Sequence, residues 1–248
     1  MEKPVGPGLA RVPVMGVTRP TQREGRACVS NVLDIIGPVM IGPSSSHTAG
    51  AARLGRIARE LLGCDAVRAD ITLYGSFAKT YRGHGTDRAL AAGIMGMATD
   101  DVRLRDSLAI ARERGLAISF REGEDATGHP NTALIELVGS AGEHVEMLGS
   151  SVGGGQVLVT SIDGLAVRVT GQRTTFVVLH RDAPGLIAAV TDVLAECGAN
   201  ICDFSLARER RGGEAVMTIE VEGEIDPRTC KRIRRLRDVT NAIELRAV

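Results

Sequence analysis

The stretch His180–Ile201, HRDAPGLIAAVTDVLAECGANI, contains one amphipathic helix together with the signals that begin and end it. Asp182 is a good N-cap, Pro184 suits the first turn, and Gly198 suits the position after the last turn. The apolar residues between them recur at the spacing of one helical face: Leu186, Val190, Val193, Leu194 and Cys197. We therefore predict a helix over 184–197.

The residues on both sides of this helix alternate between apolar and polar side chains, which is typical of strands. Expected strands cover 175–180 before the helix, and 200–208 and 214–221 after it, with a turn at 211–213. A second helix is expected over 226–236 and a last strand over 239–246. The order βαββαβ is that of the ferredoxin-like fold, which we assign to residues 173–248.

The preceding part of the chain has helices early and strands late. Helices are expected over about 48–62, from 86 onward and over 106–114, and strands over 67–77, 116–120, 133–138, 143–148 and 156–162. We predict a mixed α/β domain over 28–166, with a hinge in the segment 163–173. The whole chain is thus expected to be α+β.

The composition excludes some classes of protein. A length of 248 residues suggests about two domains. The formal net charge is zero, aromatic residues are 2% and Trp is absent, which disfavours a nucleic-acid binder. No apolar run is long enough to span a membrane. Residues 1–27 are rich in Pro, Gly and Arg and lack an apolar core, so we expect a disordered tail rather than a signal peptide.

The cysteines follow no metal-binding or disulfide pattern. They are Cys28, Cys64, Cys197, Cys202 and Cys230, and no two have the CxxC spacing. Free thiols in a reducing cytoplasm are the simplest interpretation. We therefore expect no metal site made by this chain alone.

The heptapeptide GPSSSHT, Gly42–Thr48, directly precedes the first helical pattern. One interpretation is helix capping, because a Ser or Thr hydroxyl accepts a hydrogen bond from a free backbone N–H group. The other is a site for a small anion, formed by Ser44, Ser45, Ser46 and Thr48 with the free N–H groups of the helix start. His47 would then orient or protonate the bound molecule.

Further polar residues lie next to glycine or proline. His84 lies between two glycines, His129 precedes Pro130 and Asn131, and Gly154 is the middle of three glycines that follow Ser150–Ser151. Loops of this kind allow close approach of a ligand, although the three glycines also suit a plain turn. His144 and His180 fall in expected strands, and we interpret both as structural.

The quoted stretch 180–201 resembles the opening of ACT domains, small regulatory modules that often bind amino acids between paired copies. Gly185 matches the characteristic glycine of that family, and Asn200 and Ile201 match the start of its second strand, which commonly lines the ligand groove. The resemblance implies an ACT-mediated dimer and a regulatory amino acid bound at Gly185, Asn200 and Ile201. A purely structural ACT domain is the alternative.

Four motifs occur in order in the first domain: IGPVMIGPSSSHTAGAARLG from Ile36, GHGTD from Gly83, HPN from His129 and SSVGGGQV from Ser150. Together they resemble the beta subunit of bacterial iron–sulfur L-serine dehydratase, an ammonia-lyase that converts L-serine to pyruvate and ammonia. The resemblance implies an alpha partner that carries the [4Fe–4S] cluster.

On this resemblance, His84 and His129 are a proton-transfer pair assisted by His47. The substrate would be bound by Ser44, Ser45, Ser46, Thr48, Asn131 and Gly154. Two other functions stay open. One is a non-catalytic, amino-acid-sensing regulatory subunit, because the first domain also resembles the substrate-sensing module of some phosphoglycerate dehydrogenases. The other is a serine hydrolase with Ser46 and His47, which we disfavour because neighbouring residues at a helix start rarely point together and no GxSxG motif occurs.

Overall fold

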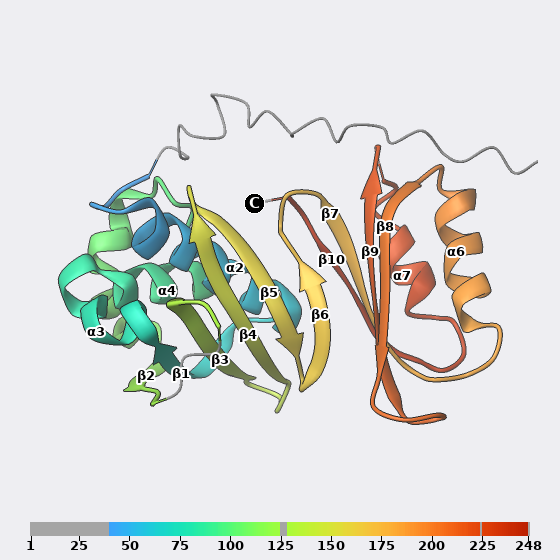
Figure 1. Ribbon diagram of the computed structural model, residues 1–248, viewed down its shortest axis with the longest axis horizontal. Helices are drawn as coiled ribbons and strands as arrows, with labels where there is room; N and C mark the ends of the chain where they lie inside the picture. Colours follow the sequence, from blue (N-terminus) through green and yellow to red (C-terminus); the bar gives the residue numbers. More distant parts are fainter. Residues whose placement is uncertain (1–39, 125–127, 224, 248) are drawn as a thin grey trace, which may run out of the picture. The chain divides into compact units, whose positions relative to one another are not determined.

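The computed structural model describes residues 40–124, 128–223 and 225–247. The expected tail at 1–27 and Cys28 lie outside these residues. The described part contains a six-stranded sheet in the order β2-β1-β3-β4-β5-β6 and a four-stranded sheet in the order β10-β7-β9-β8 (Figure 1). The predicted α+β class is confirmed.

The first domain begins with a short π-helical turn, η1 (Ser45–Ala49), which continues into helix α2 (Gly50–Leu62). Four further helical segments follow strand β1 (Ala66–Tyr74): α3 (Gly75–His84), α4 (Thr86–Ile94), η2 (Val102–Asp106) and α5 (Ser107–Glu113). The remaining strands are β2 (Ala117–Glu122), β3 (Asn131–Gly139), β4 (His144–Gly153), β5 (Gln156–Ile162) and β6 (Leu165–Val169). β1 and β2 are parallel, and each of the other neighbouring pairs is antiparallel.

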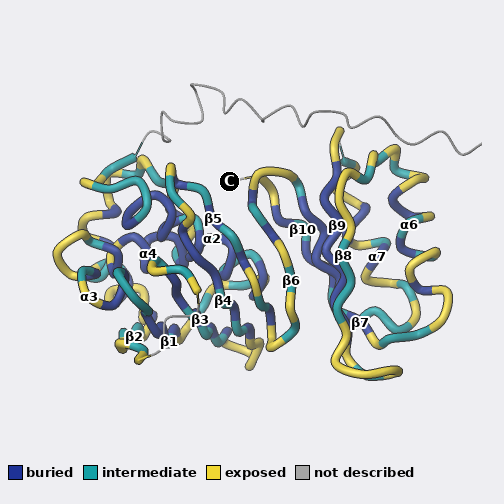
Figure 2. The backbone as a smooth tube through the Cα atoms, viewed as in Figure 1, coloured by how far each residue is buried: buried dark blue, intermediate teal, exposed yellow. Residues whose placement is uncertain are grey.

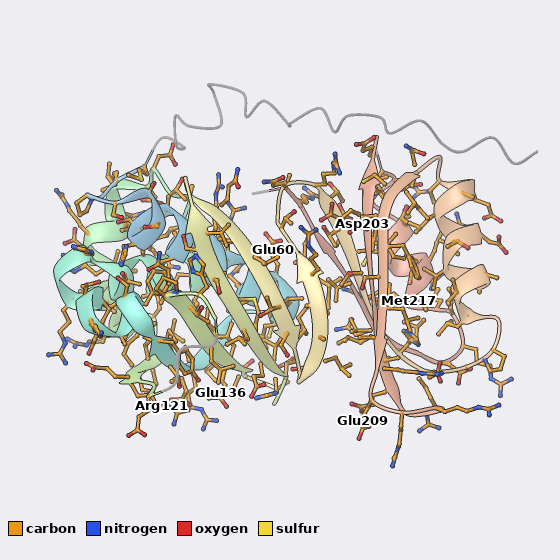
Figure 3. The ribbon with its side chains drawn as sticks, in the orientation of Figure 1. Glu60, Arg121, Glu136, Asp203, Glu209 and Met217 are labelled. Atoms are coloured by element: carbon orange, nitrogen blue, oxygen red, sulfur yellow. The ribbon has the colours of Figure 1, made fainter. Side chains whose placement is uncertain are left out.

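The six-stranded sheet has one apolar and one polar face. Ile71, Ile135 and Met147 pair across β1, β3 and β4 and are fully buried in the core, and α2 and the central strands are largely buried in Figure 2. On the opposite face, Arg121 of β2 donates to Glu136 of β3 at 2.9 Å (Figure 3). This division follows from the alternation of side chains along a strand.

Helices α2 and α4 pack closely because small residues line their contact. A Cβ atom on Gly93 would lie 2.0 Å from the carbonyl oxygen of Ala52, and one on Gly55 would lie 2.5 Å from that of Leu90. Both positions therefore require glycine. The small residues of α4 allow it to pack closely against α2.

The strand predicted over 67–77 is wrong at its end. β1 stops at Tyr74, and Gly75 begins helix α3, which the sequence pattern did not reveal. Gly75 has a φ of 58°, in the left-handed region that favours glycine, and this residue turns the chain from strand to helix. Phe77, read as the last strand residue, is fully buried in the helix.

The segment 163–173, predicted as a hinge, contains strand β6, which pairs with β5. The first sheet therefore continues to Val169, beyond the expected domain end at residue 166. A tight turn at Asp163–Gly164, both with positive φ, makes this last hairpin.

The second domain has the predicted βαββαβ order. It consists of β7 (Thr174–Arg181), α6 (Leu186–Glu196), β8 (Asn200–Arg208), β9 (Glu214–Glu222), α7 (Thr229–Ile233) and β10 (Val239–Leu245). Leu186, Val190, Val193 and Leu194 of α6 are buried, as the spacing of one helical face predicts, whereas Cys197 follows the helix and is half-buried. They pack with Phe176 and Met217, two fully buried strand residues.

Two details differ from the prediction. The N-cap of α6 is Gly185, with a φ of 84°, instead of Asp182. Asp182 accepts hydrogen bonds from the Gly212 backbone N–H and from Arg208, so it holds the β8–β9 turn. Helix α7 has five residues, fewer than the predicted range 226–236.

Candidate active site

His47 is the centre of the site, and the residues before it fix its backbone. Ser44 is the N-cap of η1, and its hydroxyl accepts a hydrogen bond from the His47 backbone N–H at 3.2 Å. The Ser44 carbonyl accepts from the backbone N–H of Thr48 at 2.9 Å. This part of the heptapeptide therefore acts as a helix cap, as one of the two interpretations predicts. In this turn His47 is buried, with 8% of its surface exposed.

Three serine hydroxyls contact the His47 ring. The Nδ1 atom lies 3.1 Å from Ser46 Oγ and 3.4 Å from Ser44 Oγ, and the Nε2 atom lies 3.2 Å from Ser76 Oγ. The expectation that Ser46 and His47 do not point together is wrong, because the π-helical turn brings their side chains onto the same side. Ser76, on α3, was not singled out from the sequence.

His84 packs edge-on against His47. Their ring centroids are 4.8 Å apart at an angle of 89°, and the Phe77 ring lies 5.2 Å from His47 on another side. Burial lowers the pKa of His47 below its ordinary value of 6.5, and the neighbouring His84 lowers it further. His47 is therefore neutral near pH 7. His84 itself is exposed and is the last residue of α3, not part of a loop as predicted, because the missed helix α3 extends to this residue.

The His129–Pro130–Asn131 turn docks on the start of α3. The Pro130 carbonyl accepts hydrogen bonds from the backbone N–H groups of Ser76 at 2.6 Å and Phe77 at 3.2 Å. Within the turn, the Asn131 backbone N–H donates to Nδ1 of His129 at 3.2 Å. The Pro130 carbonyl thus lies next to Ser76, the residue of α3 that contacts His47.

A small cavity adjoins His84. Its volume is about 120 Å³, and its lining includes Gly42, Thr48, His84 and Arg88. The Thr48 hydroxyl is buried and has no hydrogen-bond partner among the described residues, and the same holds for the side-chain oxygen of Asn131. Buried polar atoms are nearly always paired, so these two oxygens are exceptions among the described residues.

The serine–glycine motif reaches α2 from β4. A Cβ atom on Gly50 would lie 2.0 Å from the Ser151 hydroxyl oxygen, so the start of α2 is in close contact with β4. Gly154 lies in the exposed β4–β5 turn with a φ of 59°. Arg53 of α2 donates to the carbonyl of the next residue, Gly155, at 2.8 Å. The structure thus ties the glycine turn to the helix that follows His47.

Sequence reasoning missed Ser76, Arg53 and Arg88. Ser76 had no capping signal in the sequence, because the N-cap of α3 is Tyr74 and no side chain caps this helix. Arg88 directly follows the GHGTD motif. His144 lies at the exposed beginning of β4 and serves below as a control residue.

The expected effector residues of the second domain do not lie together within one chain. Asn200 and Ile201 pair with Glu222 and Val221, at the end of the sheet where β7 begins. Gly185 follows the other end of β7 and lines a cavity of about 490 Å³ with Asp182 and Arg208. A ligand that touches both sets of residues needs two copies of the domain.

The described residues contain no group of three or more His, Cys, Asp or Glu side chains that could hold a metal ion. Cys64, Cys197, Cys202 and Cys230 are free thiols on separate elements. In the same part of the chain, no helix is both long and apolar enough to cross a membrane. The donor set therefore does not fit an iron–sulfur cluster held by these residues.

Comparison with known proteins supports the motif pattern. A family model described as serine dehydratase beta chain matches residues 31–115. A probable L-serine dehydratase beta chain of Bacillus subtilis is 43% identical over 215 residues, which make up 87% of this chain and 97% of that protein. The chain belongs to the serine dehydratase beta chain family. The resemblance inferred from the motifs is confirmed.

This serine dehydratase beta chain also has more distant relatives, of two kinds. The L-serine dehydratase beta chain of Peptoniphilus asaccharolyticus is 33% identical over 193 residues, covering 77% of this chain and 87% of that one. A D-3-phosphoglycerate dehydrogenase of Synechocystis is 22% identical over 193 residues, covering 77% of this chain and 35% of that protein. A model described as AHAS small subunit-like ACT domain matches residues 176–241, which confirms the ACT domain.

Proposed function

We propose that this chain is the beta subunit of a cytoplasmic iron–sulfur L-serine dehydratase, which converts L-serine to pyruvate and ammonia together with an alpha partner. The observation that supports this most is the meeting of three motifs around His47, next to two buried polar atoms without partners. Because the described residues do not fit a cluster, we assign the [4Fe–4S] cluster to the partner.

Two orphaned oxygens account for substrate binding. The Thr48 hydroxyl donates to the substrate carboxylate, and Ser45, whose neighbours Ser44 and Ser46 contact His47, provides a second hydroxyl. The side-chain oxygen of Asn131 accepts from the substrate amino group. Hydroxyl and amide groups bind these charges in a partly buried site, where water is scarce.

The histidines act together in the proposed elimination. His129 accepts a hydrogen bond at Nδ1, so its neutral form carries the ring proton at Nε2 and can donate a hydrogen bond to the departing hydroxyl group, which leaves as water with the proton that His84 has taken from Cα. His84 is exposed at the cavity and takes the Cα proton, while neutral His47 supports its ring without adding a positive charge. Loss of water gives 2-aminoacrylate, whose imine tautomer is hydrolysed to pyruvate and ammonia.

The ACT domain gives the proposed enzyme a regulatory site. An amino acid would bind between two copies of the domain, at Gly185 of one copy and at Asn200 and Ile201 of the other. The separation of these residues within one chain supports a dimeric site.

The contact between Ser46 and His47 also suits a serine hydrolase. Such enzymes orient the histidine by a third, acidic group on its second nitrogen. Here Nε2 of His47 faces the Ser76 hydroxyl instead. The family of the chain and the contact between Ser76 and His47 favour the dehydratase over the hydrolase.

Reconstitution with the alpha partner under anaerobic conditions tests the proposal. The complex should release pyruvate from L-serine, and His84→Ala and His129→Ala should each lower kcat by about 100-fold, a typical loss for a general acid or base. His144→Ala, at the exposed start of β4, should leave kcat unchanged. Iron content and assembly are measured for every variant, since a misassembled complex loses activity for other reasons.

Normal turnover of both variants with an intact cluster would contradict a catalytic role. If the complex instead lost its sensitivity to L-serine while keeping its turnover, the chain would be the alternative, a non-catalytic sensing subunit.

A further inference from the structure

Ser76 lies where three separate segments of the site meet. Its hydroxyl contacts Nε2 of His47, a residue 29 positions earlier in the chain, and its backbone N–H donates to the Pro130 carbonyl. Its own carbonyl accepts from the Thr80 hydroxyl at 2.7 Å. The backbone of Ser76 is therefore held on both sides, and its hydroxyl group lies beside the His47 ring.

The neighbouring Gly75 makes this arrangement possible. A Cβ atom on Gly75 would lie 2.6 Å from the Pro130 carbonyl oxygen and 2.7 Å from its Cα atom. Together with the φ of 58°, this close approach requires glycine. The Gly75–Ser76 pair therefore lets the Pro130 turn reach α3 while the serine side chain reaches His47.

The ring of His47 needs a partner of defined polarity at each nitrogen. A neutral imidazole has one donor and one acceptor nitrogen, and the hydrogen bond at one nitrogen decides the role of the other. At Nδ1, Ser44 and Ser46 share the contact and lie 3.3 Å from each other. At Nε2, the Ser76 hydroxyl is the partner that the structure shows among its described residues.

We propose that Ser76 is a positioning residue, whose hydroxyl fixes the tautomer and the ring orientation of His47 against which His84 packs. Ser76 acts through His47 and touches no substrate. The catalytic consequence rests on the proposed function, but the effect on the His47 ring does not.

Nitrogen NMR of the full chain with ¹⁵N-labelled histidine tests the effect on the ring directly. The chain has five histidines, and the His47 signals are identified by their loss in His47→Gln. Ser76→Ala should shift both ring nitrogens of His47 toward a mixture of tautomers, while Ser76→Thr, which keeps the hydroxyl, should preserve the original pattern. Ser76→Cys keeps the side-chain volume with a weak donor and should resemble Ser76→Ala.

Kinetics of the reconstituted complex provide the second measurement. Ser76→Ala should lower kcat by about 10- to 100-fold while KM changes by less than about twofold, because a misoriented base loses rate without losing substrate contacts. Ser76→Thr should recover most of the loss. Ser119→Ala, at an exposed serine of β2 that donates to Asp70 of β1, is the matched control and should change nothing.

Unchanged His47 signals in Ser76→Ala and Ser76→Cys would overturn the inference, whatever the activity. Altered signals with unchanged kcat would support the positioning of His47 by Ser76 and contradict the role of the histidines under the proposed function. The two failures are thus separable. Circular dichroism of each variant excludes a folding defect, and Ser76→Cys controls for the side-chain volume that Ser76→Ala removes.

Discussion

Replacing Gly93 with alanine should destabilise the first domain, because it forces helices α2 and α4 apart. The added Cβ atom would lie 2.0 Å from the carbonyl oxygen of Ala52 and 2.9 Å from the backbone nitrogen of Arg56. These are backbone atoms, so no side-chain rotation relieves the overlap. To reach 3.4 Å, where ordinary contact begins, the oxygen must move by about 1.4 Å.

The cost follows from what this shift disturbs. Leu54 and Ile57 of α2, and Leu90 and Ile94 of α4, have at most 1% of their surface exposed. Overpacking of such a core costs about 1–3 kcal/mol. The better helix propensity of alanine returns about 0.5–1 kcal/mol. Because the clash is with the backbone, we place the overpacking cost near the upper end of its range. The net loss in the free energy of unfolding should then be about 2 kcal/mol.

Urea unfolding followed by tyrosine fluorescence measures this loss selectively. The chain has two tyrosines, Tyr74 and Tyr81, and no tryptophan, so the signal comes from the first domain. Gly83→Ala is the matched control, since Gly83 is also helical and has no atom within 4 Å of the added Cβ. It should raise stability by about 0.5–1 kcal/mol. Equal or higher stability of Gly93→Ala would refute the argument from helix packing.

Two further predictions concern the heptapeptide. In the reconstituted enzyme, Ser45→Ala should raise KM about tenfold with kcat nearly unchanged. Ser46→Ala removes a contact to His47 and should mainly lower kcat. The opposite pattern would mean that Ser46 binds the substrate and that Ser45 supports the proton transfer. The lowered pKa of His47 means that the unfolded chain binds more protons than the folded chain below about pH 6.5. The free energy of unfolding should therefore decrease as the pH falls through this range, and His47→Gln should make the decrease shallower in the same urea titrations.

The second domain could be predicted from its sequence because its signals are local. Pro184 and Gly198 lie close to the two ends of α6, and the apolar residues between them mark one face. The prediction erred at Asp182, which has the right chemistry for an N-cap. Its carboxylate instead bonds Gly212 and Arg208, which are far away in sequence, and local pattern does not reveal such partners.

The first domain was harder to predict, because one alternating apolar stretch contains both the end of a strand and the start of a helix. From Ala69 to Phe77 apolar residues recur at nearly every second position, yet the strand ends at Tyr74. The distinguishing residue is Gly75, which needs a positive φ and a close backbone neighbour. The neighbour is Pro130, in a later motif, so only the folded chain shows why a helix begins there.

The motifs of the site are short because each depends on contacts with the others. Each supplies one part that the others complete: the serines cap and contact His47, α3 presents Ser76 and His84 from its two ends, and the Pro130 carbonyl caps α3. The length of α3 decides how both of its ends reach the same imidazole. A substitution that moves this helix should therefore disturb the Pro130 turn and the His47–His84 contact together, whereas the motifs taken singly predict independent effects. Sequence can identify the parts, but their coupling depends on the helix that its pattern concealed.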